Sequence, residues 1–401
     1  MNTDEETFNT TIKYWYTLSQ IFGIIPISPF VKCNKHESYK VKFLYISWTL
    51  IWVLFVAVFA CYDSFHMISA YVVKSPTHSF SIVMSYCSMY MACIINLINN
   101  IVLRNNFPEI MGKLWNVDKI LIPRSGISLY HKEIFQSLRD IAVLSAFNII
   151  IVIAICWTCG VKSFTEILFY SAENIPLFMN AIVSLQFKMF VKKLNERLIL
   201  VKKIVTEYTF CHQEKLIKPR AERKPISFIE DTMDTSAVSI FRQSEDIQLI
   251  RDVYISLFKT KTLIVSTYAI PIILQLLTTY TYCVGILYWG ICGLFSKTDL
   301  LDVIIYFVAV CYTLLLFAYV LLNCDNATEE PGKITRCIQE IIAKPNFPKA
   351  VERDLMKFVS QMKDMTFEFQ PGGLFTFNLS LLCSTVGVIS TYVVILIQFK
   401  D

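Results

Sequence analysis

Long apolar runs, separated by polar segments, dominate this chain. A helix needs about 20 apolar residues to cross the hydrocarbon core of a bilayer, and seven runs reach that length. We therefore predict an all-α membrane protein with seven transmembrane helices. The predicted spans are Phe43–Tyr62, Phe80–Leu103, Ile141–Val161, Phe164–Phe190, Leu263–Phe295, Val303–Asn323 and Leu374–Phe399.

The lengths of the spans and their connections add two expectations. Almost nothing separates the third span from the fourth, which predicts a tight helical hairpin. The fifth span is too long for one straight crossing, so it must tilt, bend near Pro271 or project beyond the membrane.

Positive charge alternates between the polar segments. In order, the eight segments outside the spans, counted with their flanks, hold 5, 1, 6, 1, 15, 1, 7 and 1 of the 37 Lys and Arg residues. Lys and Arg accumulate on the cytoplasmic side of membrane proteins. This pattern predicts a cytoplasmic N-terminus, seven crossings and an extracellular C-terminus.

The cytoplasmic segments carry helical apolar stripes of their own. One contains Ile334, Ile338 and Ile341, and another contains Val351 and Leu355. Such stripes must be buried against other apolar surface, so we favour a compact helical base over flat helices on the membrane surface. We divide the chain into a cytoplasmic N-terminal segment (1–42), spans one to four (43–190), a cytoplasmic helical extension with a flexible loop near 218–236 (191–262), spans five and six (263–323), cytoplasmic anchor helices (324–373) and the last span (374–401).

Composition supports a lipid environment and argues against an enzyme. Hydrophobic residues make up 55% of the chain and charged residues 17%, against about 25% charged in soluble domains. The chain contains no P-loop, zinc-protease, nucleophile-elbow or dinucleotide motif, and its five His residues have no ligand spacing. We therefore expect no catalysis, metal, cofactor or nucleic-acid partner.

Polar and aromatic residues gather in the outer halves of the helices. The outward loops are short, so a small organic ligand would have to bind among these residues. The alternative for each Trp or Tyr is an interfacial belt position. An acidic group such as Glu173 within a span is costly unless it is paired or hydrated, which makes it a functional candidate. The candidates for a ligand pocket are Ser85, Trp157, Tyr170, Glu173, Asn174, Tyr282 and Tyr306.

The last span carries a regular polar stripe. Ser384, Thr391 and Gln398 recur every seven residues, which places them on nearly one helix face. Such a stripe can line a pore if several copies surround an axis. It can equally serve helix packing, where small and polar residues also concentrate, and periodicity alone leaves both possibilities open.

The end of this span resembles a known signature. Thr391 and Tyr392, five hydrophobic residues, then Gln398 and Phe399 are similar to the final-helix motif of insect gustatory receptors. The resemblance implies a tetrameric, ligand-gated, poorly selective cation channel, homomeric or heteromeric, in the plasma membrane of taste neurons. It implies that Gln398 and Phe399 form the outer constriction of the pore, with Thr391 and Ile395 deeper along the same helix. Ser384, from the polar stripe, is a further candidate for the pore.

One position departs from a branch of that family. Receptors for common sugars often carry Glu directly after the Thr-Tyr pair, where this chain has Val393. The departure argues against a ligand of that branch. Among the remaining ligands of the family, a bitter or plant-derived tastant is favoured by number, with a sugar such as fructose as the alternative.

Three other classes compete with this interpretation. An insect odorant receptor would share the architecture but carry a different last-helix motif. A G-protein-coupled receptor would have the opposite orientation, and its Asp-Arg-Tyr and Asn-Pro-x-x-Tyr motifs are missing here. A transporter would show internal repeats or broken helices, and we find neither.

Overall fold

A computed structural model describes residues 2–24, 39–71, 76–125, 129–158, 163–217, 231–295, 300–343 and 349–398. Within these ranges, side chains are not described at 2–6, 39–42, 64, 66–71, 76–79, 82, 158, 165, 173, 208–217, 231–245 and 302.

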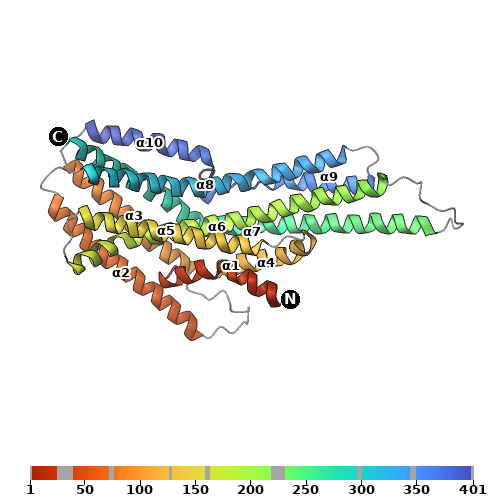
Figure 1. The fold of residues 1–401 in the computed structure, drawn as a ribbon, viewed down its shortest axis with the longest axis horizontal. Coiled ribbons are helices and arrows are strands. Elements are labelled where there is room, and N and C mark those ends of the chain that lie inside the picture. The colour runs from red at the N-terminus through yellow and green to blue at the C-terminus, as the bar shows by residue number, and fades with distance from the viewer. Residues whose placement is uncertain are drawn as a thin grey trace.

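Helices form almost all of the described structure (Figure 1), and these residues include no strand. The helices are α1 (Asn2–Ile21), α2 (Tyr39–Tyr71), α3 (Pro76–Val102), α4 (Asn106–Ser125), α5 (Tyr130–Thr158), α6 (Phe164–Ile217), α7 (Asp231–Phe295), α8 (Leu300–Ile342), α9 (Lys349–Asp364) and α10 (Leu379–Gln398), with a short 3-10 turn η2 (Pro371–Gly373) before α10.

Among the described residues, seven helices are long and apolar enough to cross a membrane, which confirms the predicted number. These are α2, α3, α5, α6, α7, α8 and α10. In Figure 1, α2, α3 and α10 lie toward one end of the molecule, whereas α6, α7 and α8 run on toward the opposite end, beside α4 and α9. The fifth span is part of the 65-residue helix α7. At about 1.5 Å per residue this helix is much longer than the hydrocarbon core of a bilayer, so it projects beyond the membrane.

Helix α6 is the centre of the bundle. In its most apolar window 72% of the residues are buried, against 11% in α2 and α5, and α6 packs against α3, α4, α5, α7 and α8. It continues unbroken past Phe190 to Ile217, because apolar residues such as Leu194, Leu198 and Val201 recur at helical spacing and are all buried.

The stripes predicted between the last two spans are buried in a helical base. Ile334, Ile338, Val351 and Leu355 are all at most 6% exposed. The ring of Tyr254 on α7 packs against Phe358 of α9 and against Phe367, with ring centroids 5.5 and 5.3 Å apart. The compact base is therefore correct, and the flat surface arrangement is not.

Two helices were not predicted. Helix α1 buries Phe8, Ile12, Trp15 and Tyr16 against the bundle, and α4 buries Ile110, Leu114, Val117 and Leu121. Both follow helical spacing, but each is too polar overall to stand out by hydropathy. In addition, α7 begins at Asp231, inside the stretch predicted as a flexible break.

The C-terminus of α1 is tied to α2. The indole nitrogen of Trp48 donates to the carbonyl of Gln20 at 3.1 Å, and that of Trp52 donates to the carbonyl of Ile21 at 3.0 Å. The hydroxyl of Thr49 donates to the carbonyl of Gly23 at 3.0 Å. These bonds satisfy carbonyls that a helix end leaves unpaired.

Candidate pore helix and ligand site

The entry to α10 is fixed by local hydrogen bonds. The backbone N–H of Phe377 donates to the carbonyl of Phe369 at 2.8 Å, and the Phe377 ring is buried beside Phe187 and Phe317. Asn378 then caps the helix, since its Oδ1 accepts from the N–H of Leu381 at 3.3 Å. The start of α10 is therefore anchored to α6 and α8.

Helix α10 has one buried face and one free face. Its buried residues are Thr385, Ile389 and Val393, and it packs against α7 and α8. Ser384, Thr391 and Gln398 are exposed. At 3.6 residues per turn, the centres of these two sets lie about 160° apart around the helix axis.

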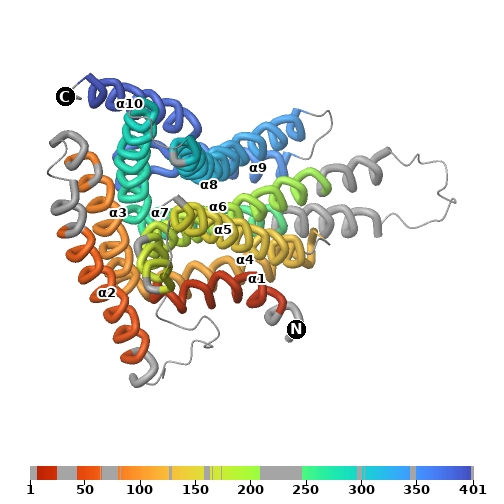
Figure 2. Tube along the Cα trace, turned by 60° about the vertical axis from the view of Figure 1, so that its left-hand side comes forward, coloured from red at the N-terminus to blue at the C-terminus, as the bar shows by residue number. Residues whose placement is uncertain are grey.

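The polar stripe therefore points away from its own chain. Figure 2 shows α10 at the edge of the molecule, beside α7 and α8. Ile395 borders the same stripe and is 38% exposed. An outward polar stripe on a membrane helix is available either to another subunit or to an aqueous pore.

The residues of the last-helix motif have different surroundings. The Tyr392 ring meets Tyr280 of α7 edge-on, with centroids 5.7 Å apart, so it packs against α7. Thr391 lies on the free stripe and Gln398 ends the helix. Val393 is buried in an apolar cluster with Cys283 and Val310. Phe399 lies outside the described residues.

One of the predicted pocket residues, Ser85, lies at the contact between α3 and α7. The Ser85 hydroxyl lies 2.8 Å from the carbonyl oxygen of Ser81 and 2.9 Å from that of Thr281 on α7. Tyr282, the next residue on α7, is half-buried. The helices approach closely here: a Cβ added at Gly285 on α7 would lie only 2.2 Å from the Ser85 hydroxyl.

The other candidates are spread over α5, α6 and α8. Asn174 donates to the Tyr170 carbonyl at 2.8 Å, and both residues are half-buried on α6. The Tyr306 ring on α8 meets Trp289 of α7 edge-on at 6.0 Å. Trp157, at the end of α5, is 77% exposed, as is typical of an interfacial tryptophan. The Glu173 side chain lies outside the described residues.

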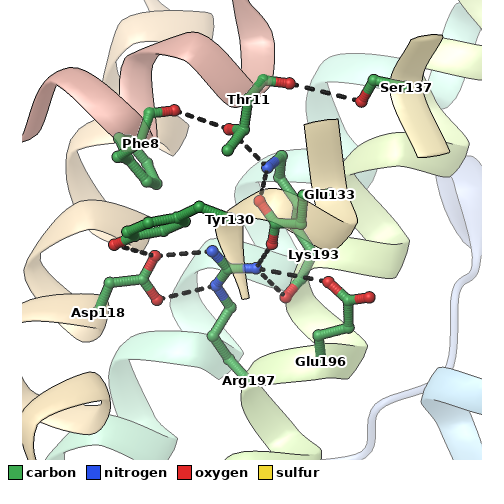
Figure 3. Close-up of polar contacts among 9 residues, drawn as sticks. All are labelled: Phe8, Thr11, Asp118, Tyr130, Glu133, Ser137, Lys193, Glu196 and Arg197. Atoms are coloured by element: carbon green, nitrogen blue, oxygen red, sulfur yellow. Dashed lines mark hydrogen bonds and ion pairs between the residues drawn. The ribbon is translucent and has the colours of Figure 1, made fainter. Parts of the chain in front are cut away.

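A buried ionic cluster joins four helices and was missed in the sequence (Figure 3). Arg197 on α6 pairs with Asp118 of α4 at 2.7 Å and with Glu133 of α5. Lys193 pairs with the same Glu133 and donates to the Thr11 hydroxyl of α1 at 3.0 Å. The signal in the sequence that could have indicated this cluster is the pair of cations Lys193 and Arg197, four residues apart on the helix that carries the apolar stripe of Leu194, Leu198 and Val201.

The cluster compensates its own charges. Burial raises the pKa of Asp118, and the adjacent Arg197 opposes that rise. Two carboxylates face two cations, all at most 5% exposed, so the group is close to neutral as a whole. Nothing in it is shaped for a metal: among the described residues no three His, Cys, Asp or Glu side chains converge as ligands.

Comparison with known proteins identifies the family. The model of the 7tm chemosensory receptor family matches residues 12–401. The gustatory receptor for sugar taste 43a of Drosophila melanogaster is 29% identical over 149 residues, which is 37% of this chain and 35% of that receptor.

Two solved structures share the fold. The olfactory receptor OR5 of Machilis hrabei is 14% identical, with a TM-score of 0.66 over 97% of this chain and 98% of the receptor. OR5 in complex with eugenol gives a TM-score of 0.65 at 13% identity over the same shares. Because the family model covers nearly the whole sequence, this chain belongs to the 7tm chemosensory receptor family.

Proposed function

We propose that this receptor is a ligand-gated, non-selective cation channel in which α10 from each subunit lines a central pore. The observation that carries the proposal is the free polar stripe of Ser384, Thr391 and Gln398, opposite the face that α10 buries in its own chain. A monomer leaves this stripe unpartnered, whereas a ring of subunits, homomeric or heteromeric, would turn it toward water at the axis. Gln398 and Phe399 would form its outer constriction.

The ligand we propose is a small organic tastant. The partial match to a sugar-taste receptor of Drosophila supports a gustatory role, and the similar olfactory receptor in complex with eugenol supports a small organic molecule as the ligand class. Val393, in place of the Glu found in many receptors for common sugars, argues against a ligand of that kind; a bitter or plant compound is favoured among the remaining ligands, with fructose as the alternative. The plasma membrane of chemosensory neurons is the corresponding location.

The proposed pocket lies among the outer halves of α3 and α5–α8. Ser85 and Tyr282 would contribute from α3 and α7, Tyr306 from α8, and Tyr170, Glu173 and Asn174 from α6. Glu173 would be the specific polar contact, so Glu173→Gln should shift the concentration for half-maximal response and leave conductance unchanged. A matched change at Glu166, seven residues earlier on α6, serves as the comparison.

A second candidate function is an olfactory receptor subunit. The observation in its favour is that the two similar solved structures, which match 97% of this chain, are of an olfactory receptor. A panel containing sugars, bitter plant compounds and volatile odorants separates the two functions, because only one group should activate at low concentration.

The deciding experiment is recording from excised patches of cells that express this chain alone. Ligand-evoked cation current in outside-out patches, perfused without GTP, is the expected result. Responses that appear only in intact cells and vanish with G-protein inhibition would refute the channel. If expression alone gives no response, co-expression with other subunits of the family tests the heteromer with the same recording.

A further inference from the structure

A polar cavity lies between α5 and α6, close to the ionic cluster. The empty space at this site, open solvent included, is about 280 Å³. Glu133, Asp140, Lys188, Lys192, Lys193 and Glu196 line it, together with Trp15 of α1. Charged side chains are costly to bury in a helical bundle unless they are paired, so the six that line this cavity require an explanation.

Most of the lining charges are already paired. Lys193 pairs with Glu133, and Glu133 also forms an ion pair with Arg197. Lys188 pairs with Asp140 at 2.5 Å and donates to the Tyr319 hydroxyl of α8 at 2.7 Å. Arg139, more exposed, shares Asp140 at 3.3 Å. These pairs account for four of the six charged side chains.

Lys192 and Glu196 are the two that remain. Among the described residues no carboxylate oxygen lies within 4.0 Å of the Lys192 ammonium. Glu196 is 8% exposed and its Oε1 accepts no hydrogen bond. Its other oxygen lies 4.0 Å from Arg197, and Figure 3 shows Oε1 turned away from that contact. A buried acceptor without a partner costs free energy, so a donor from a bound ligand would stabilise it.

The predicted ends of the third and fourth spans place the cavity at the level of the inner lipid headgroups. Lys192 is two residues beyond Phe190, the predicted cytoplasmic end of the fourth span, and Asp140 directly precedes the third span. Exposed apolar residues lie about one helical turn from residues at the cavity: Val143, three residues after Asp140 on α5, is 59% exposed, and Leu315 and Leu322, on either side of Tyr319 on α8, are 69% and 44% exposed. These side chains are suited to contact with acyl chains.

We propose that this cavity binds the headgroup of an aminophospholipid of the inner leaflet. The lipid phosphate pairs with Lys192, and its primary ammonium donates to Glu196 Oε1. One ligand thus supplies both the anion that Lys192 lacks and the donor that Glu196 lacks. A purely anionic lipid supplies no cation for Glu196, and phosphatidylcholine carries a quaternary ammonium with no N–H to donate.

The test uses the purified full-length receptor in neutral detergent, with short-chain lipid binding counted by native mass spectrometry. The wild type should bind phosphatidylethanolamine about tenfold more tightly than phosphatidylcholine, the value of one charge-assisted hydrogen bond. Glu196→Gln should remove most of that preference. Lys192→Met should weaken both lipids about tenfold and keep the preference, because the phosphate is common to them.

Matched controls lie on the same helix. Lys203→Met and Glu207→Gln remove a cation and a carboxylate that pair with each other at 3.2 Å near the surface, and both should leave lipid binding unchanged. Glycerophosphoethanolamine, which lacks acyl chains, should bind much more weakly than the lipid. The proposal would be overturned if the wild-type receptor bound phosphatidylethanolamine and phosphatidylcholine equally, or bound phosphatidylglycerol more tightly than phosphatidylethanolamine. It would also be overturned if the preference survived in Glu196→Gln, or if the free headgroup bound as tightly as the lipid.

Discussion

Arg197 on α6 and Asp118 on α4 form a two-point ion pair inside the protein. Nε of Arg197 lies 2.9 Å from Oδ1 of Asp118, and Nη2 lies 2.7 Å from Oδ2. Both side chains are 0% exposed. The same guanidinium reaches Glu133 on α5, so one side chain fixes the relative positions of three helices.

Removing this arginine should destabilise the fold strongly. Arg197→Met leaves Asp118 and part of Glu133 buried without compensation, which typically costs about 3–5 kcal/mol. We expect a marked loss of monodisperse receptor and a lower melting temperature in detergent. Arg124→Met is the control, because it breaks a more exposed pair with Asp246 at 3.4 Å worth about 0–1 kcal/mol. Similar melting temperatures for the two variants would contradict a stabilising role for the cluster.

Gly285 should tolerate no side chain while Ser85 is present. In Gly285→Ala the new Cβ would lie 2.2 Å from the Ser85 hydroxyl and 3.3 Å from the Ser81 carbonyl oxygen. Ser85 must then leave its bond to the Thr281 carbonyl, and we expect a loss of about 1–3 kcal/mol. The double variant Gly285→Ala with Ser85→Gly frees the space and should recover part of the stability. No rescue in thermal unfolding would show that the backbone contact limits the site.

The polar stripe of α10 should control permeation. Gln398→Ala and Thr391→Val should change single-channel conductance or relative cation permeability, because each alters a polar side chain on the free face. Ser390→Ala is the matched control: Ser390 is also exposed and also bonds the carbonyl four residues back, at 2.9 Å, but it lies about 100° away from Thr391 around the axis. Unchanged currents in the first two variants at normal surface expression would refute the pore assignment.

Val393 should not accept the glutamate found in many sugar receptors. Its side chain is 5% exposed and packs with Cys283 and Val310, so Val393→Glu buries a carboxylate at a cost of several kcal/mol. We expect poor surface expression without any gain of sugar response. Val393→Thr should be much milder, because its hydroxyl can bond to a carbonyl in the preceding turn. A well-expressed Val393→Glu receptor with new sugar sensitivity would show that α10 rotates away from this packing.

The sequence alone determined the features that depend on local composition. Seven apolar runs, the amphipathic stripes around Ile334 and Val351, and the spacing of Ser384, Thr391 and Gln398 follow from neighbouring residues along one helix. Transfer of a segment to lipid and helical periodicity are both local properties, so these predictions required no partner.

Tertiary structure alone decided which residues meet across helices. Asp118 and Arg197 are 79 positions apart, and nothing in either neighbourhood specifies the other. The same holds for α1 and α4, whose weak apolar stripes matter only because the bundle offers a surface to cover them. It also holds for α10: its sequence supplies a polar stripe, but only packing against α7 and α8 buries Val393 and leaves Thr391 free. The physical reason is that burial and ion pairing depend on groups that the chain brings together only when it folds.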